Sequence, residues 1–273
     1  MLAPAVPGQR TLGAMGSPLA AWVDRALSLT PARAAAFGLR ELAALLLPTS
    51  CALCQAPDHR LCPRCARQLV AQLHLPPLGP ALRCRLELPQ HQELFLVCAA
   101  GLYANELAQA ILAFKNRQRV FLAAQFAPYL AAAAAALSPP CVPGEQVWLV
   151  PVPSSPAART RRGYWPVQRI LCRAQADGLI PARLSCRPIL RHRFSLRPAG
   201  AQKGKSRSQR RSSGGALYAF DAARPGQQVL LVDDVVTTGA TLIAAANACR
   251  AAGYRVIGAV ALALTPPPST ETR

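Results

Sequence analysis

The chain has 273 residues, of which 52% are hydrophobic, and its formal net charge is +19. This hydrophobic content excludes a disordered, collagen-like or low-complexity protein, and the length suffices for one large domain or two small ones. The most apolar stretch, residues 120–137, is interrupted by Gln125 and Pro128 and is shorter than the roughly 20 residues that cross a bilayer. The first residues do not resemble a signal peptide, so we expect a cytoplasmic protein without a membrane span.

The N-terminal part of the chain is expected to carry a small module and no large domain. Residues 1–38 are rich in Pro, Gly, Ala and Ser, and we expect a poorly ordered extension there. Leucines at helical spacing predict an amphipathic helix over 31–47 that Pro48 ends. Residues 39–92 are assigned to a zinc-ribbon-like module and a Pro-rich linker, the linker covering roughly 74–92.

A larger domain is predicted for residues 93–265, followed by a frayed tail at 266–273. Its apolar runs alternate with amphipathic segments. Strands are expected at 94–101, 147–152, 228–232 and 255–264, a basic loop at 191–215, and helices at 106–117, 121–137 (with a break or kink at Pro128), 166–177 and 241–252. This alternation predicts an α/β fold with a mostly parallel sheet and helices on both faces.

Two adjacent carboxylates, Asp233 and Asp234, follow the apolar strand at 228–232. Ligands of open α/β sheets bind at the carboxyl ends of strands, and the first amides of the next helix suit a phosphate. The turn adds three hydroxyl groups and one glycine that permits close backbone approach: Thr237, Thr238, Thr241 and Gly239. Carboxylates repel phosphate, so their expected partners are ribose hydroxyls or a hydrated Mg²⁺. Helix capping is the competing interpretation, but one Asp would suffice for it, and the chain has only 12 acids.

A second motif is a tight cluster of cysteines in a CxxC–x7–CxxC pattern, formed by Cys51, Cys54, Cys62 and Cys65. Two such knuckles offer four thiolates to one tetrahedral ion, which leaves no open position for water. The pattern therefore predicts structural Zn²⁺. A thioredoxin-like redox pair is the alternative, but the βαβ context of such a pair is not found around the cluster.

The positive charge is concentrated between Arg159 and Arg211, where 13 Arg and two Lys face one acid, Asp177. Such a stretch attracts phosphate-bearing partners, either a small phosphorylated ligand or nucleic acid. A solvated cationic surface is the plainer interpretation for any single arginine among them.

The segment 229–242 resembles the phosphoribosyl-pyrophosphate (PRPP) binding motif of type I phosphoribosyltransferases. Further features occur in a matching order: the four-cysteine module, the helix Leu107–Lys115, the segment Val150–Pro153 and the triplet Arg162-Gly163-Tyr164. Together they resemble the ComF/GntX family of competence-associated, phosphoribosyltransferase-like proteins over about residues 40–265. Trp165 and Pro166 depart from that family, which usually has Asn and Gln there.

The resemblance implies a PRPP-type pocket and a role in handling imported DNA. It makes Asp233 and Asp234 the catalytic pair that holds the ribose hydroxyls, with Mg²⁺ bridging ribose and pyrophosphate. It assigns the phosphates to Val235, Val236, Thr237, Thr238, Gly239, Ala240, Thr241, Arg161 and Arg162. One hypothesis is a phosphoribosyltransferase acting on PRPP. The other is a non-catalytic module that binds single-stranded DNA or recombination and uptake proteins, with a vestigial or regulatory nucleotide pocket.

Overall fold

The computed structural model describes residues 49–74, 82–88, 93–139, 146–192 and 217–265. The chain divides into two compact units, 1–50 with 57–59, and 51–56 with 60–273. In the first unit, Ser50 and Pro57 form a single antiparallel bridge. All elements named below belong to the second unit. The expected extension at 1–38, the helix at 31–47, nearly all of the basic loop at 191–215 and the tail at 266–273 lie outside the described residues.

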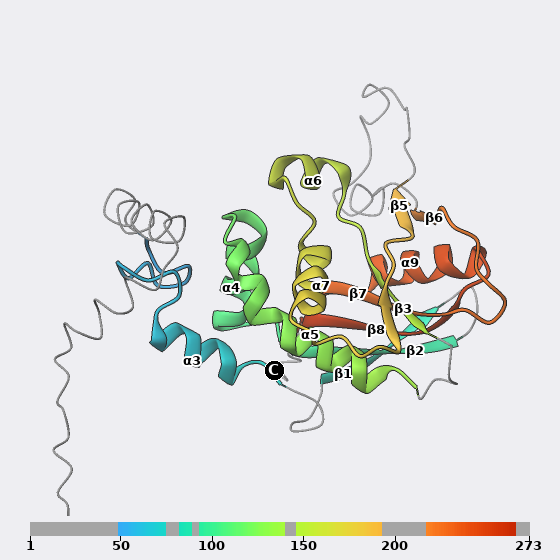
Figure 1. Ribbon diagram of the computed structural model, residues 1–273, viewed down its shortest axis with the longest axis horizontal. Helices are drawn as coiled ribbons and strands as arrows, with labels where there is room; N and C mark the ends of the chain where they lie inside the picture. Colours follow the sequence, from blue (N-terminus) through green and yellow to red (C-terminus); the bar gives the residue numbers. More distant parts are fainter. Residues whose placement is uncertain (1–48, 75–81, 89–92, 140–145, 193–216, 266–273) are drawn as a thin grey trace, which may run out of the picture. The chain divides into compact units, whose positions relative to one another are not determined.

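A six-stranded mixed sheet forms the centre of the second unit (Figure 1). Its order is β1-β2-β8-β7-β3-β4, and all neighbours are parallel except the edge pair β1–β2. The strands are β1 (Leu82–Leu88), β2 (Glu93–Leu102), β3 (Val147–Pro151), β4 (Leu184–Cys186), β7 (Gln228–Val236) and β8 (Arg255–Leu264). A separate two-stranded sheet pairs β5 (Leu190–His192) with β6 (Leu217–Ala219).

Helices cover both faces of the sheet, as the alternating sequence pattern predicted. They are α3 (Pro63–Ala71), α4 (Asn105–Asn116), the 3-10 turn η1 (Val120–Leu122), α5 (Ala123–Leu137), α6 (Pro156–Arg162), α7 (Pro166–Ala176) and α9 (Ala240–Ala251). Side chains of a strand alternate between faces. Leu230 and Val232 of β7 therefore join the core under α4, α5 and α7, whereas Val229 and Leu231 join the core under α9. The α/β fold class is confirmed.

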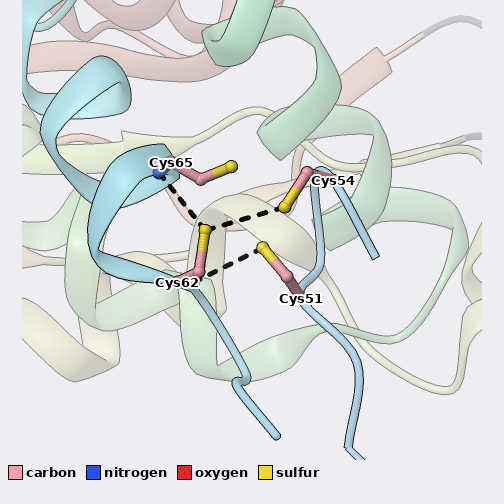
Figure 2. Close-up of side chains that lie close together, drawn as sticks. All are labelled: Cys51, Cys54, Cys62 and Cys65. Carbon is pink, nitrogen blue, oxygen red and sulfur yellow. Dashed lines mark hydrogen bonds between the residues drawn. The ribbon is translucent and has the colours of Figure 1, made fainter. Parts of the chain in front are cut away.

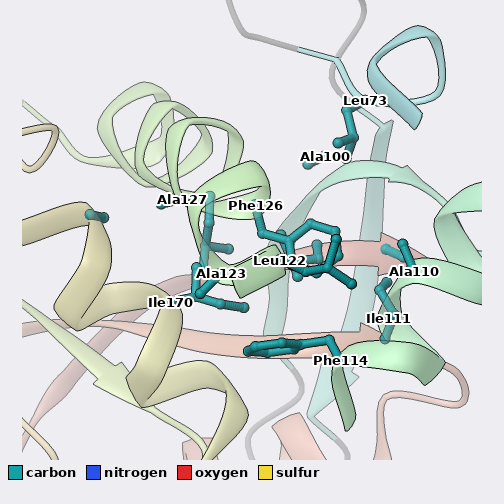
Figure 3. Packing of buried hydrophobic residues seen from close by; sticks show 14 of the residues in the cluster. Leu73, Ala100, Ala110, Ile111, Phe114, Leu122, Ala123, Phe126, Ala127 and Ile170 are labelled. Carbon is teal, nitrogen blue, oxygen red and sulfur yellow. The ribbon is translucent and has the colours of Figure 1, made fainter. Parts of the chain in front are cut away.

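The core under α4, α5 and α7 is the larger of the two (Figure 3). Phe114 and Phe126 meet edge to face in it, with ring centroids 5.7 Å apart. Contrary to the expectation from the sequence, residues 120–137 are long and apolar enough to cross a membrane by length and composition, and they are the one such segment within the described ranges. In this structure α5 packs on β2, β8 and α7, as a core helix of the domain.

The cysteine-bearing segment is attached to the same body through α3 and the residues that follow it. His74 N donates to Ala100 O of β2 at 2.7 Å, and Leu107 N donates to Gln72 Oε1 at 3.0 Å. The Gln72 amide also donates to Glu106 in the first turn of α4. The bond from Leu107 N gives one first-turn amide of α4 a partner that its own helix cannot supply.

Several elements differ from the sequence expectations. The segment expected as a linker contains β1, which completes the sheet edge by pairing with β2. Helix α5 runs through Pro128, and the irregular turn lies earlier, at η1. Strand β7 extends past Val232 to Val236, because β8 continues to pair with it there. The short elements α6, β4, β5 and β6 were not predicted, since three to seven residues carry too little periodicity.

Candidate functional site

The two adjacent carboxylates lie inside the last part of β7, not beyond its end. Asp233 pairs in register with Ala261 of β8, and Asp234 follows it. Consecutive residues of a strand project to opposite faces, so the two side chains have different surroundings. Asp234 is buried on the side of α4, and Asp233 is half-buried. The acidic pair therefore consists of two chemically distinct groups.

Asp234 forms an ion pair with Lys115 in the last turn of α4. The distance between Lys115 Nζ and Asp234 Oδ1 is 2.7 Å, and the side chains are 22% and 12% exposed. Partial burial weakens the screening of this pair by water. The sequence pointed to a helix ending in a lysine but not to its partner. The available signal was that Lys115 is one of only three lysines in the chain.

Asp233 is electrostatically the more perturbed carboxylate of the pair. Burial raises its pKa well above the ordinary value, and the neighbouring charge of Asp234 raises it further. A hydrogen bond from Asp234 N to Asp233 Oδ1, 2.8 Å long, and the charge of Lys115 act in the opposite direction. A cationic or hydroxyl-bearing ligand would therefore stabilise the ionised form of Asp233.

The turn from β7 to α9 presents donors at a helix N-terminus. Thr237, Thr238 and Thr241 are exposed, and in the described part of the chain the α9 terminus lacks a side-chain cap from its N-cap residue, Gly239. Thr238 Oγ1 accepts a 3.4 Å bond from Ala240 N. Unpaired first-turn amides and the positive end of the helix dipole suit an anion.

Gly239 is required at this turn for two reasons. Its φ is +74°, in the left-handed region, and a Cβ there would lie 2.5 Å from Leu86 Cδ1 of β1. The close neighbour of Gly239 in the structure is thus the Leu86 side chain of the edge strand β1. From the sequence, this glycine was expected only to permit close approach of a ligand.

The loop after β3 runs directly beside the acidic strand. Val152 N donates to Val232 O at 2.8 Å, one residue before Asp233. The loop leads into α6, which carries the two predicted arginines. Arg161 is exposed, whereas Arg162 is half-buried and places Nη1 3.5 Å from Ser154 Oγ. Arg162 Nε is buried without a hydrogen-bond partner among the described residues, which marks it as a donor available to an anion.

Tyr164 links the arginine-bearing loop to α4. Its hydroxyl donates to Phe114 O, and its ring lies 5.6 Å from that of Phe114. Burial raises the pKa of Tyr164, against the opposing effect of the Arg162 charge. Because Phe114 immediately precedes Lys115, one contact ties the arginine segment to the helix that pairs with Asp234. Sequence reasoning noticed Tyr164 only as part of a triplet.

The four predicted cysteines come together (Figure 2). All four sulfur atoms lie within 4.8 Å of one another, which fits tetrahedral thiolate coordination, where Zn–S bonds near 2.3 Å imply S···S distances of about 3.8 Å. Cys62 caps α3 by accepting from Cys65 N, and Cys62 N donates to Cys51 Sγ. Burial opposes ionisation of Cys51, yet backbone hydrogen bonds outweigh it and lower its pKa to about 6. This donor set suits zinc.

A cavity of about 710 Å³ is lined by the β3–α6 loop and by residues of β5 and β6. Its lining includes Ser154, Arg159 and Trp165, and none of the described residues that line it comes from the turn at 233–241. The acidic turn and this cavity are therefore separate features, and the loop after β3 adjoins both of them.

Comparison with known proteins agrees with the fold and the acidic turn. A family model described as "Phosphoribosyl transferase domain" matches residues 204–271. An orotate phosphoribosyltransferase of Bacillus caldolyticus is 39% identical over 56 residues, 20% of this chain and 27% of that protein. An adenine phosphoribosyltransferase of Methylobacterium radiotolerans is 51% identical over 39 residues, 14% of this chain and 22% of that protein. The chain thus spans about a quarter of the length of these curated relatives.

These observations support a phosphoribosyltransferase-type fold, with the family match covering residues 204–271. The mostly parallel sheet, the acidic turn and the matched segment support that class together. The chain adds a four-cysteine cluster consistent with a zinc-ribbon-like module ahead of this domain.

Proposed function

We propose that the protein binds PRPP, or a related phosphoribosyl ligand, with Mg²⁺ at the turn between β7 and α9. One observation carries this proposal. The acidic pair is followed, within one turn, by helix α9, whose N-cap residue Gly239 has no side chain that could cap the first amides of the helix. Acids suit the sugar hydroxyls and amides suit the phosphate, and a phosphoribosyl group has both. The family match over 204–271 supports the same ligand class.

Each predicted residue has a role in this arrangement. Asp233 and Asp234 accept hydrogen bonds from the ribose hydroxyls, and residues 235–241 bind the 5′-phosphate through amides and hydroxyls. Arg161 and Arg162 neutralise the pyrophosphate, and the buried Nε of Arg162, without a partner in the described part of the chain, supports this role. Ser154, which contacts Arg162 from the loop after β3, is a further donor that the sequence did not single out.

The carboxylate oxygens also fit the hard-cation chemistry of Mg²⁺. Asp233 is the better placed of the two ligands, because Lys115 already occupies Oδ1 of Asp234. Bound Mg²⁺ would supply charge neutralisation for the departing pyrophosphate. The chain's own contribution is to hold ribose and phosphates in register, which is the main demand of this displacement.

The proposed activity is transfer of phosphoribose to an acceptor. The bond between C1 of the ribose and the pyrophosphate oxygen breaks, and the acceptor's electron pair forms the new bond to C1. The resemblance to ComF/GntX proteins, in motif order and in the four-cysteine module, supports an association with competence and DNA uptake. We assign the four-cysteine cluster to structural Zn²⁺ and the protein to the cytoplasm, because clustered thiols persist as metal ligands in reducing compartments.

A second candidate function is a non-catalytic module for single-stranded DNA or for recombination and uptake proteins. Three exposed arginines on the four-cysteine segment favour it: Arg60, Arg64 and Arg67. Arg60 stacks 4.5 Å above the Phe121 ring, which holds its charge at the surface. A steep fall of DNA affinity with rising salt, reduced by Arg64→Ala with Arg67→Ala, is the expected signature.

Calorimetric titration of the full chain with PRPP, with and without Mg²⁺, tests the first proposal. Saturable binding is expected, and Asp233→Asn with Asp234→Asn should abolish it. Asp221→Asn, which changes an exposed carboxylate elsewhere, is the matched control and should bind normally. Pyrophosphate release from PRPP then separates an enzyme from a binding module. Equal binding by the double variant would overturn the assignment of the site.

A further inference from the structure

The cavity beside the β3–α6 loop is a second concave site, and of the residues that the proposed function uses, Ser154 alone is among the described residues that line it. It has a volume of about 710 Å³, within the range of small-molecule sites. Its walls come from the loop after β3, from α6 and the start of α7, and from the small β5–β6 sheet (Figure 1).

The charge of this cavity favours an anion. Its lining includes Arg159, Arg191 and His192, and none of the lining residues within the described ranges is an acid. The Arg191 guanidinium stacks 4.5 Å from the centroid of the Phe220 ring. Phe220 is outside the lining, whereas Arg191 is part of it, and a guanidinium that contacts a ring keeps N–H groups that can bind a phosphate.

The cavity also has aromatic walls. Trp165 and Tyr218 line it, and the indole is fixed because Nε1 donates to Val152 O at 3.0 Å. A ring anchored at one edge offers a rigid face on which a planar ligand can stack at low entropic cost. Ser154 and Thr160 add hydroxyls to the same lining.

We propose that this cavity binds a nucleoside monophosphate, with the base stacked on Trp165 and the phosphate held by Arg159 and Arg191. A ligand with both an aromatic plane and a phosphate matches the aromatic and the basic walls of the cavity. Inorganic phosphate would contact the basic wall alone. This site is distinct from the acidic turn and does not depend on whether PRPP binds there.

Occupation of the cavity is coupled to the loop beside the acidic strand. Trp165 Nε1 bonds Val152 O, and a His192 ring nitrogen lies 3.1 Å from Pro153 O. The same loop is joined to β7 through Val152 N and Val232 O. A ligand that contacts Trp165 and His192 therefore acts on the same loop that bonds the acidic strand.

Calorimetric titration of the full chain carrying Asp233→Asn with Asp234→Asn tests the proposal, because these changes remove the acidic turn as a competing site. AMP should bind saturably without Mg²⁺, about tenfold more tightly than ribose 5-phosphate, which lacks the base. Adding Arg159→Ala and Arg191→Ala should weaken AMP binding at least tenfold. Arg169→Ala, an exposed arginine of α7 outside the lining, is the matched control and should leave it unchanged.

Tryptophan fluorescence of the unmodified chain is the second measurement. AMP should change the emission, and Trp165→Phe should remove that change while Trp22 and Trp148 remain. Three results would overturn the proposal: no saturable AMP binding, binding that requires the acidic pair, or AMP and ribose 5-phosphate binding equally well. A failure of PRPP to bind leaves this test intact, so the two proposals fail separately.

Discussion

Lys115 Nζ lies 2.7 Å from Asp234 Oδ1, although 119 positions separate the two residues in the chain. The contact joins the end of α4 to the C-terminal part of β7, and both elements belong to the larger core. When the charge of Lys115 is included, the three groups carry a net charge of −1 with both aspartates ionised, instead of the −2 of the two aspartates alone. Asp234 is therefore the ion-paired carboxylate of the two, whereas Asp233 has no ion pair among the described residues.

Removal of the Lys115 charge should destabilise the protein through Asp234. Lys115→Met leaves a buried carboxylate unpaired, and we expect a cost of about 2 kcal/mol, below the range for fully buried pairs because both side chains retain some exposure. Lys115→Met combined with Asp234→Asn should recover most of that loss. Urea unfolding of the four proteins of this cycle measures the coupling, and strictly additive costs would show that the pair contributes nothing.

Asp233 should make stability depend on pH. Its pKa is raised by folding, so the folded protein holds the Asp233 proton more tightly than the unfolded chain does. The stability from this proton is complete below the unfolded pKa of about 4 and is lost as pH rises through the folded pKa. Asp233→Asn, which mimics the protonated form, should raise Tm at pH 8 and should not raise it near pH 3. An equal effect at both values would contradict the shift.

Gly239 should tolerate alanine worse than a glycine whose only requirement is a positive φ. Gly178 has φ +67° and open space around its missing Cβ, so Gly178→Ala should cost only the backbone strain of about 1–2 kcal/mol. Gly239→Ala adds a 2.5 Å approach to Leu86. Leu86→Ala in the same chain should remove that added cost but not the strain. Thermal unfolding measures both differences, and identical costs at the two glycines would rule out the packing contact.

The four-cysteine cluster should hold one Zn²⁺ per chain. Loss of any ligand leaves three thiolates around the ion, so Cys65→Ser should release the metal and loosen the segment around α3. Cys172→Ser changes an exposed cysteine outside the cluster and should keep full zinc content. Metal analysis and limited proteolysis check both variants. A zinc-free native protein that resists proteolysis would contradict a metal-dependent module.

The sequence by itself determined the main repeating elements and the clustering of the four cysteines. The long apolar runs that became β7 and β8, and the periodic segments that became α4 and α7, carry enough side chains to specify their structure locally. The CxxC spacing likewise sufficed to bring four sulfur atoms together, because its geometry is local to 15 residues.

Only the tertiary structure decided which distant groups meet. Lys115 finds Asp234, Tyr164 finds Phe114, and Leu86 covers Gly239, and in each case the partners are at least 50 positions apart. The extension of β7 through its two aspartates and the pairing of β1 depend on neighbouring strands in the same way. Local patterns set which conformation a segment prefers, whereas the sheet order and the helix packing set what each side chain then touches.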